Sequence, residues 1–138
     1  EYRSQTTSGT CSIAQRAGII AYTEGLASVD LMKEAFARRR QLVYDLLNAI
    51  PGVKTNLPEG AFYFFPEISS FFGKKDLNGN LIKDSADLAL YLLNEGHVAT
   101  VGGDSFGNNN YIRLSYAASD DNLKEALRRI KEALGKLA

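Results

Sequence analysis

The chain has 138 residues, a hydrophobic fraction of 45% and no net charge, because 16 basic residues balance 16 acidic ones. This length suits one domain with its own core, and the balanced charge gives no indication of a nucleic acid or an anionic membrane as partner. With one histidine and one cysteine, Cys11, the sequence predicts neither an internal disulfide nor a metal site, and the lone cysteine fits a reducing cytoplasm. No apolar run approaches the length of a membrane span.

The first predicted helix begins at Ser12, which has the spacing of a capping box with Gln15, and it ends at Gly25. Its apolar stripe has helical spacing and consists of Ile13, Ala17, Ile20 and Ala21. Further small and apolar residues widen this stripe. Little of this helix is therefore expected to face water.

A second, longer helix is predicted from about Ser28 until Pro51 and Gly52 end it. Its core face is expected to consist of Leu31, Ala35, Phe36, Leu42, Val43, Leu46, Leu47 and Ile50. Three consecutive arginines, Arg38 to Arg40, cannot share one face of a helix. At least one of them is therefore expected to be solvated only.

Two strand-like segments and a loop follow this helix. The segments are Val53 to Thr55 and Ala61 to Phe65, and the second is so aromatic that both of its faces are expected to be covered. Residues 69–85 form the loop, in which Asn78-Gly79 favours a small hairpin with a tight turn.

A third helix is predicted from Asp84 or Ser85 to Glu95, with Gly96 as its stop. Three leucines are expected to face inward: Leu88, Leu92 and Leu93. His97 to Val101 is predicted as a strand that leads into a glycine-rich loop.

The last two elements are a strand over Tyr111 to Tyr116 and a helix that begins at Ser119 and Asp120. The helix has an apolar stripe of Leu123, Ala126, Leu127, Ile130, Leu134 and Leu137. The order of helices and strands predicts an α+β fold: a small, mostly antiparallel sheet covered on one face by helices, with a long N-terminal helix before it.

Arg113 lies in the middle of the last predicted strand, where alternate side chains point to opposite faces of the sheet. Tyr111, Arg113 and Ser115 therefore share one face. A planar guanidinium that is always charged needs an anion, and a carboxylate fits it through two parallel hydrogen bonds. Arg113 is the candidate anchor for a substrate carboxylate; a structural ion pair with an internal Asp or Glu is the alternative.

Four separated segments carry a resemblance to a known family. They are TSGTCSIAQ at residues 7–15, PEGAFY at 58–63, VATVGGDSFG at 98–107 and YIRLSYA at 111–117. In this order and spacing, the chain from about Ser4 to its end resembles the C-terminal part of pyridoxal-phosphate aminotransferases of the aspartate aminotransferase family. The family has a proline where this chain has Gly102, which leaves the path of the glycine-rich loop open.

The resemblance implies that Arg113 binds the α-carboxylate of the substrate. It also implies that the Schiff-base lysine and the other residues that hold pyridoxal phosphate lie upstream of this chain. No catalytic and no cofactor-binding residue is therefore assigned here, and no cofactor is expected on the fragment. By the same resemblance, residues 1–27 correspond to the tail of the large domain, and residues 28–138 to the small domain with its linking helix.

On this basis the full-length protein is expected to be a cytoplasmic, homodimeric aminotransferase, and the fragment alone to be inactive. It would move an amino group between an amino acid, with aspartate favoured, and a 2-oxo acid. Two alternatives remain: a binding or regulatory module without catalysis, and a carbon–carbon lyase or synthase of the same superfamily. The roles of Ser4, Thr6, Thr7 and His97 stay open, although a structural or exposed histidine is the simpler interpretation of His97.

Overall fold

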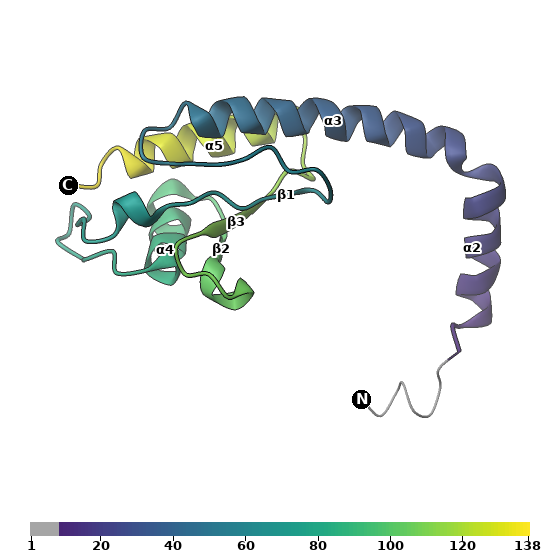
Figure 1. Cartoon of the computed structure of the whole chain (residues 1–138), viewed down its shortest axis with the longest axis horizontal. Coiled ribbons are helices and arrows are strands. Elements are labelled where there is room, and N and C mark those ends of the chain that lie inside the picture. Colours follow the sequence, from purple (N-terminus) through teal and green to yellow (C-terminus); the bar gives the residue numbers. More distant parts are fainter. Residues whose placement is uncertain (1–8) are drawn as a thin grey trace. The chain divides into compact units, whose positions relative to one another are not determined.

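The computed structural model describes residues 9–138, apart from the side chains of residues 26 and 27. Its elements, labelled in Figure 1, are the helices α2 (Ser12–Glu24), α3 (Leu26–Asn48), α4 (Ser85–Gly96) and α5 (Asp120–Leu134), the strands β1 (Tyr63–Phe64), β2 (Val101–Gly102) and β3 (Ile112–Ser115), and the short 3-10 helices η1 (Ser69–Phe71) and η2 (Gly103–Phe106). Residues 36–138 form one compact unit and the residues before them another, and α3 contributes to both.

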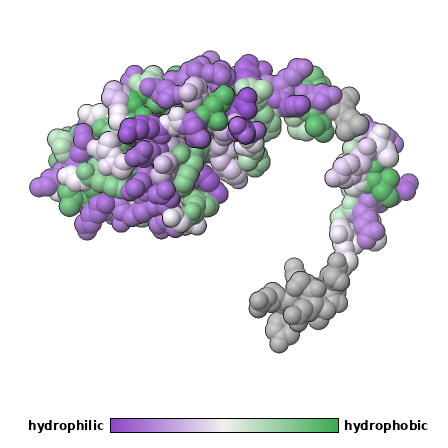
Figure 2. All heavy atoms as spheres, viewed as in Figure 1, coloured by the Kyte–Doolittle hydropathy of each residue, from purple (hydrophilic) through white to green (hydrophobic). Residues whose placement is uncertain are grey.

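Helix α2 begins where the sequence predicts, but the capping box is not formed. Cys11 is the N-cap residue, and no side chain accepts a hydrogen bond from the first turn. Gln15 Nε2 instead donates to the carbonyl oxygen of Thr10 at 2.6 Å. No residue of α2 is buried, and hydrophobic residues lie exposed along it, as the green spheres in Figure 2 show. None of the described residues covers the apolar stripe, so a buried face of this helix would need a partner from outside them.

The three strands form one antiparallel sheet with β3 in the middle, in the order β1-β3-β2. Tyr63 pairs with Ser115, and Val101 pairs with Arg113. On the inner face, Ile112 is buried and helices lie over the sheet (Figure 1). The predicted α+β fold, with an antiparallel sheet covered on one face by helices, is confirmed.

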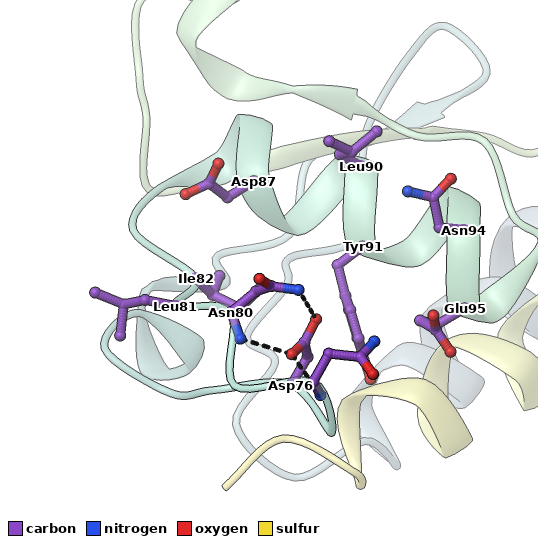
Figure 3. A pocket seen from close by; sticks show the side chains of 10 residues that line it. Asp76, Asn80, Leu81, Ile82, Asp87, Leu90, Tyr91, Asn94 and Glu95 are labelled. Atoms are coloured by element: carbon purple, nitrogen blue, oxygen red, sulfur yellow. Dashed lines mark hydrogen bonds between the residues drawn. The ribbon is translucent and has the colours of Figure 1, made fainter.

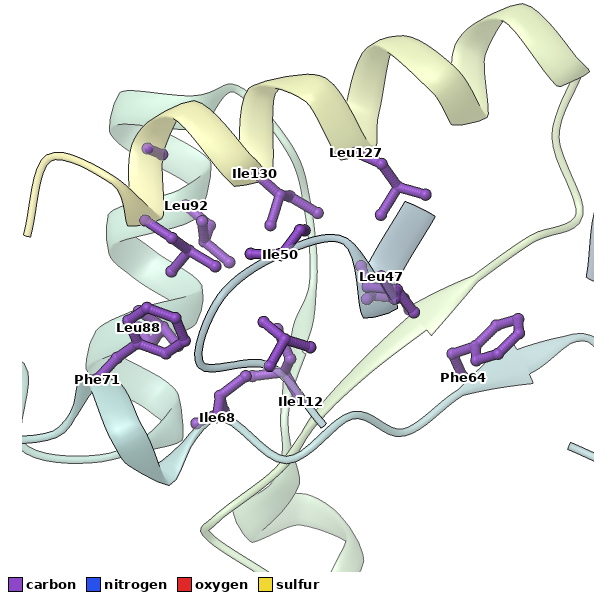
Figure 4. Close-up of a cluster of buried hydrophobic side chains, with 14 of the residues drawn as sticks. Leu47, Ile50, Phe64, Ile68, Phe71, Leu88, Leu92, Ile112, Leu127 and Ile130 are labelled. Carbon is purple, nitrogen blue, oxygen red and sulfur yellow. The ribbon is translucent and has the colours of Figure 1, made fainter. Parts of the chain in front are cut away.

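The hydrophobic core fills the space between the inner face of this sheet and three helices. Figure 4 shows side chains from α4, α5 and the end of α3 converging on Phe64 and Ile112 of the sheet. The largest fully buried side chains of this core include Leu47, Phe64, Ile68, Leu88, Leu92, Ile112 and Ile130. Burying each such side chain contributes about 1.5–3 kcal/mol, so this core fixes the sheet and everything mounted on its outer face.

The strands are shorter than the sequence predicts, and backbone conformation explains two of the differences. Ala61 has a φ of 57° and His97 a φ of 53°, and such left-handed residues cannot continue a strand. β1 therefore begins only at Tyr63, and His97 caps helix α4 instead of opening a strand. The predicted strand around Lys54 is reduced to one antiparallel bridge with Glu67.

Two predicted core positions on the helices are wrong. Leu31 is 70% exposed and Leu93 is 49% exposed. In α4 the inward position is taken by Tyr91, which is buried and whose hydroxyl donates to the carbonyl oxygen of Ala133 at 2.8 Å. An amphipathic tyrosine can be buried where its hydroxyl finds a partner.

All three consecutive arginines of α3 have partners, so the prediction that at least one is solvated only is wrong. Arg38 Nε donates to Asp120 at 3.1 Å, and Arg39 Nε donates to the same carboxylate at 3.0 Å. Arg40 Nη1 donates to the carbonyl oxygen of Pro58 at 3.1 Å. Although the three residues lie on different faces of α3, their long side chains connect α3 to the start of α5 and to the loop before β1.

Because Asp120 forms ion pairs with both Arg38 and Arg39, we expect the stability of the fold to depend on pH. Hydrogen bonds from Arg38 and then Arg39 lower the pKa of Asp120 to about 2. A carboxyl group with a lowered folded-state pKa contributes stability that is present above its unfolded pKa and is lost as the pH falls toward the folded value. We therefore expect Asp120→Asn to lower Tm at pH 6, and the difference from the wild type to shrink as the pH falls from about 4 to about 2.

Asp121→Asn is the matched control for that measurement. Asp121 lies in the same first turn of α5, and the ion pairs found within residues 9–138 do not include it. Both variants lose one charge near the helix N-terminus, so they share any helix-dipole effect. A gap between Asp120→Asn and wild type that stays constant from pH 6 to pH 2 would contradict the role of the pair.

Candidate functional site

The candidate site is the outer face of the sheet, with Arg113 at its centre. Arg113 lies in β3, the middle strand, and is half-buried. Residues paired directly across antiparallel strands point to the same face. Tyr63 and Val101 therefore lie on the face of Arg113 and Ser115, and none of these four residues is fully buried. The alternation predicted for this strand is confirmed.

Two aromatic rings flank the guanidinium group of Arg113. Its Cζ lies 4.4 Å from the ring centroid of Tyr63 and 4.4 Å from that of Phe106. Tyr63 comes from β1, and Phe106 comes from η2, which follows β2 directly. Because β1 and β2 lie on opposite sides of β3, the two rings approach from opposite flanks. Each cation–π contact stabilises this orientation by about 0.5–1 kcal/mol at an exposed site.

The aromatic surface continues beyond Arg113 into a groove. The rings of Phe65 and Phe106 meet edge to face at 6.0 Å, and Phe65 stacks on Tyr111 at 4.9 Å. The groove has a volume of about 570 Å³ and is lined by Lys54, Thr55, Asn56, Phe65, Glu67, Asn108 and Tyr111. Tyr63 and Phe65, which point to the outer face, are only half-buried, so the prediction that both faces of the aromatic strand are covered is wrong for the outer face.

Arg113 has no carboxylate partner within residues 9–138. The ion pairs found there join Arg38 and Arg39 to Asp120, and join α5 residues to one another. The hydrogen bonds found for side chains in the same part of the chain do not include the Arg113 guanidinium either. The alternative of a structural ion pair therefore finds no support in the part of the molecule that the structure describes.

A buried serine at the start of α4, Ser85, holds the glycine-rich loop in place through hydrogen bonds. Ser85, the first residue of α4, is 0% exposed, and its Oγ accepts a hydrogen bond from the Gly103 backbone at 3.1 Å and donates to Asn109 Oδ1 at 2.7 Å. Gly103 N also donates to the carbonyl oxygen of Tyr111 at 2.8 Å. Sequence reasoning missed Ser85, Asn109 and Phe106 as parts of the site; only the glycine loop itself gave a local signal.

The sequence also singled out His97, Cys11 and three polar residues near the N-terminus. His97 is exposed and left-handed at the end of α4, which agrees with a structural or exposed histidine. Cys11 is exposed at the start of α2. Ser4, Thr6 and Thr7 lie outside the described residues.

A cofactor held as a Schiff base, such as pyridoxal phosphate, requires a suitable lysine. A lysine that forms a Schiff base is activated by desolvation or by a neighbouring cation. All eight lysines of the sequence lie within the described residues, and none of them is buried. None of them therefore has the desolvated surroundings that activate such a lysine, and no chemical step is derived through the cofactor here.

A second pocket, of about 250 Å³, lies between α4 and the hairpin loop before it (Figure 3). The carboxylate of Asp76 accepts hydrogen bonds from the backbone of Asn78 and from the backbone and side chain of Asn80, at 2.8–2.9 Å. An antiparallel bridge between Lys75 and Leu81 closes the predicted hairpin. Asp76 thus closes a turn, and the described residues include no group of three potential metal ligands.

None of the helices described here combines the length and the apolar character that crossing a membrane requires. Among curated proteins, the chain is 43% identical over 136 residues to an aspartate aminotransferase of Rhizobium meliloti, which covers 99% of this chain and 33% of the relative. It is 42% identical over 135 residues to an aspartate aminotransferase of Pinus pinaster, which covers 96% of this chain and 27% of the relative. The chain thus spans about a third of the length of such relatives or less.

Solved structures agree with these sequence matches. The crystal structure of the aspartate aminotransferase from Rhizobium meliloti superposes with a TM-score of 0.90 at 42% identity, over 99% of this chain and 34% of that one. An alanine aminotransferase from Pyrococcus furiosus gives a TM-score of 0.77 at 29% identity, over 88% of this chain and 29% of that one. The family model for aminotransferase class I and II matches residues 2–130. The chain therefore belongs to the aminotransferase class I and II family.

Proposed function

We propose that the full-length protein is a pyridoxal-phosphate-dependent aminotransferase that uses aspartate as its favoured amino donor, and that Arg113 binds the α-carboxylate of the substrate. One observation carries the assignment of Arg113. A half-buried guanidinium is mounted at the centre of an open sheet face, without a carboxylate partner among residues 9–138. Such a group needs an anion, and the substrate supplies one.

The surroundings of Arg113 support a carboxylate as that anion. Tyr63 and Phe106 lie against the guanidinium, which leaves its N–H groups at the edge as the free donors. A carboxylate accepts two parallel hydrogen bonds from such an edge. Holding the substrate by this fork fixes the orientation of its Cα, which is the contribution of this part of the protein to catalysis.

Pyridoxal phosphate would supply the electron sink for the reaction in the full-length enzyme. We assign its binding to residues outside this chain, because no lysine here fits its covalent anchor. Relatives that are about three to four times as long as this chain support that assignment. The lone Cys11 fits a reducing compartment such as the cytoplasm.

The chain alone is expected to be catalytically silent. Mixing it with pyridoxal phosphate and reducing with borohydride should give only sparse labelling spread over surface lysines, because none of the eight is buried. Peptide mapping with a transaminase assay checks this. A stoichiometric adduct at one lysine, together with turnover, would show that the chain carries its own catalytic centre.

The domain boundary is a further part of the proposal: residues 1–27 belong to a large domain, and residues 28–138 form the small domain with its linking helix. The exposed apolar residues of α2 support this, since a surface such as that around Ile13, which is 80% exposed, is normally covered. In hydrogen exchange on a dilute monomer, α2 should exchange fast and α4 and α5 slowly. Strong protection of α2 in that monomer would mean that α2 belongs to the small domain and that the boundary lies before it.

Experiments on the full-length protein test the function. The protein should sediment as a dimer, and it should transfer the amino group of aspartate to 2-oxoglutarate. A carbon–carbon lyase or synthase of the same superfamily would instead release a different product from its amino acid, and a non-catalytic module would bind it without turnover. Product analysis by mass spectrometry separates these three outcomes.

A further inference from the structure

We propose that Phe106 is a positioning residue for Arg113, held in place by Ser85, so that the start of helix α4 controls how tightly the substrate carboxylate is bound. The inference rests on the proposed function of Arg113 as the carboxylate anchor. Phe106 and Ser85 would touch no reacting atom; they would act through the guanidinium group.

The Arg113 side chain is already restricted before a ligand binds. A long, flexible side chain loses rotamer entropy when it is ordered on binding a ligand. Tyr63 and Phe106 already restrict it, because each ring centroid lies 4.4 Å from Cζ. With the guanidinium plane held between rings from opposite flanks, its edge is presented to the carboxylate before the carboxylate arrives.

Phe106 is held by its backbone more than by burial of its ring. Its side chain is 45% exposed, so burial in the core does not fix it. Its ring contacts only Arg113 and the edge of Phe65 among the aromatic and cation–π contacts of residues 9–138. The position of the ring therefore depends on the backbone of η2, the four-residue turn that carries it.

A buried hydroxyl connects η2 to helix α4. At the start of η2, Gly103 N donates to Ser85 Oγ, and the same hydroxyl donates to Asn109 on the far side of the loop. Asn109 Oδ1 also accepts from Ser85 N at 3.2 Å. One buried hydroxyl thus joins both ends of the glycine-rich loop to α4. Losing it would leave buried polar groups unpaired and loosen the turn beneath Phe106.

A double-variant cycle in the intact enzyme tests the proposal. Phe106→Leu is expected to raise KM for aspartate and Ki for the inhibitor succinate by about 3- to 10-fold, with kcat changed less, because about 1 kcal/mol of orientation is lost. In the Arg113→Lys background, Phe106→Leu should change KM by less than about 2-fold, because the guanidinium that Phe106 orients is absent. Phe72→Leu, at a half-buried phenylalanine that packs on the core, is the matched control and should leave KM unchanged.

Ser85→Ala should reproduce the KM effect of Phe106→Leu, and a thermal melt checks that this buried site still folds. Nuclear magnetic resonance of the chain gives a readout independent of catalysis. Ring currents should shift the Arg113 side-chain protons upfield, and Phe106→Leu should reduce that shift while Phe72→Leu preserves it. Equal effects of Phe106→Leu in both backgrounds, or unshifted Arg113 protons in the wild type, would overturn the inference and leave the anchor role of Arg113 standing. An unchanged KM in Arg113→Lys alone would instead overturn the proposed function.

Discussion

Arg113→Lys is expected to lower kcat/KM of the intact enzyme for aspartate by about 30- to 1,000-fold. Lysine keeps the positive charge but loses the planar fork and its stacking on Tyr63 and Phe106. The loss of a charge-assisted, bidentate contact and the resulting misplacement of the substrate correspond to about 2–4 kcal/mol of transition-state stabilisation. Steady-state kinetics with aspartate measures the change, while binding of pyridoxal phosphate should stay nearly the same.

Arg128→Lys is the control for that experiment. Arg128 makes its ion pairs to Glu125 and Glu132 on the exposed surface of α5. Such pairs contribute little to stability, so kcat/KM should be unchanged. A kcat/KM of Arg113→Lys within experimental scatter of the wild type would mean that Arg113 has a structural role only.

Gly103→Ala is expected to have the largest effect on stability, by about 3 kcal/mol or more. A Cβ atom at this position would overlap the backbone oxygens of Asn108 and Tyr111, which cannot move aside as a flexible side chain could. Relieving the overlap would also break the hydrogen bonds from Gly103 N to Tyr111 and to Ser85. For a unit of this size the change corresponds to a fall in Tm of roughly 10–20 °C, measurable by calorimetry.

Gly60→Ala provides the comparison. No heavy atom lies within 4 Å of a Cβ built on Gly60, and its φ is outside the left-handed range. Replacing such a glycine restricts the unfolded chain, so Tm should stay the same or rise slightly. If Gly103→Ala proved as stable as Gly60→Ala, the close approach of Gly103 to the backbone of Asn108 and Tyr111 would be contradicted.

The local features of the fold could be predicted from the sequence because they depend on neighbours along the chain. Asp84 and Ser119 cap α4 and α5 as the capping rules indicate. The stripe of α5 has strict helical spacing, and Leu123, Leu127 and Ile130 are buried as it predicts. The alternation in β3 likewise placed Arg113 on the face opposite the core.

The contacts that build the site could not be predicted in this way, because they join residues far apart in sequence. Tyr63 and Phe106 meet at Arg113 only once β1 and β2 have taken their places beside β3. Ser85 looks like an ordinary helix start until the glycine-rich loop folds against it. The exposed stripe of α2 shows the same limit, since hydrophobic spacing predicts a buried face without naming what buries it.

The most direct measurement is a crystal structure of the full-length enzyme with succinate bound. We expect one carboxylate at the edge of Arg113, with two N–H···O hydrogen bonds of about 2.7–2.9 Å, and with the rings of Tyr63 and Phe106 against the guanidinium. Succinate bound away from Arg113, with an Asp or Glu of the protein paired to the guanidinium instead, would contradict it.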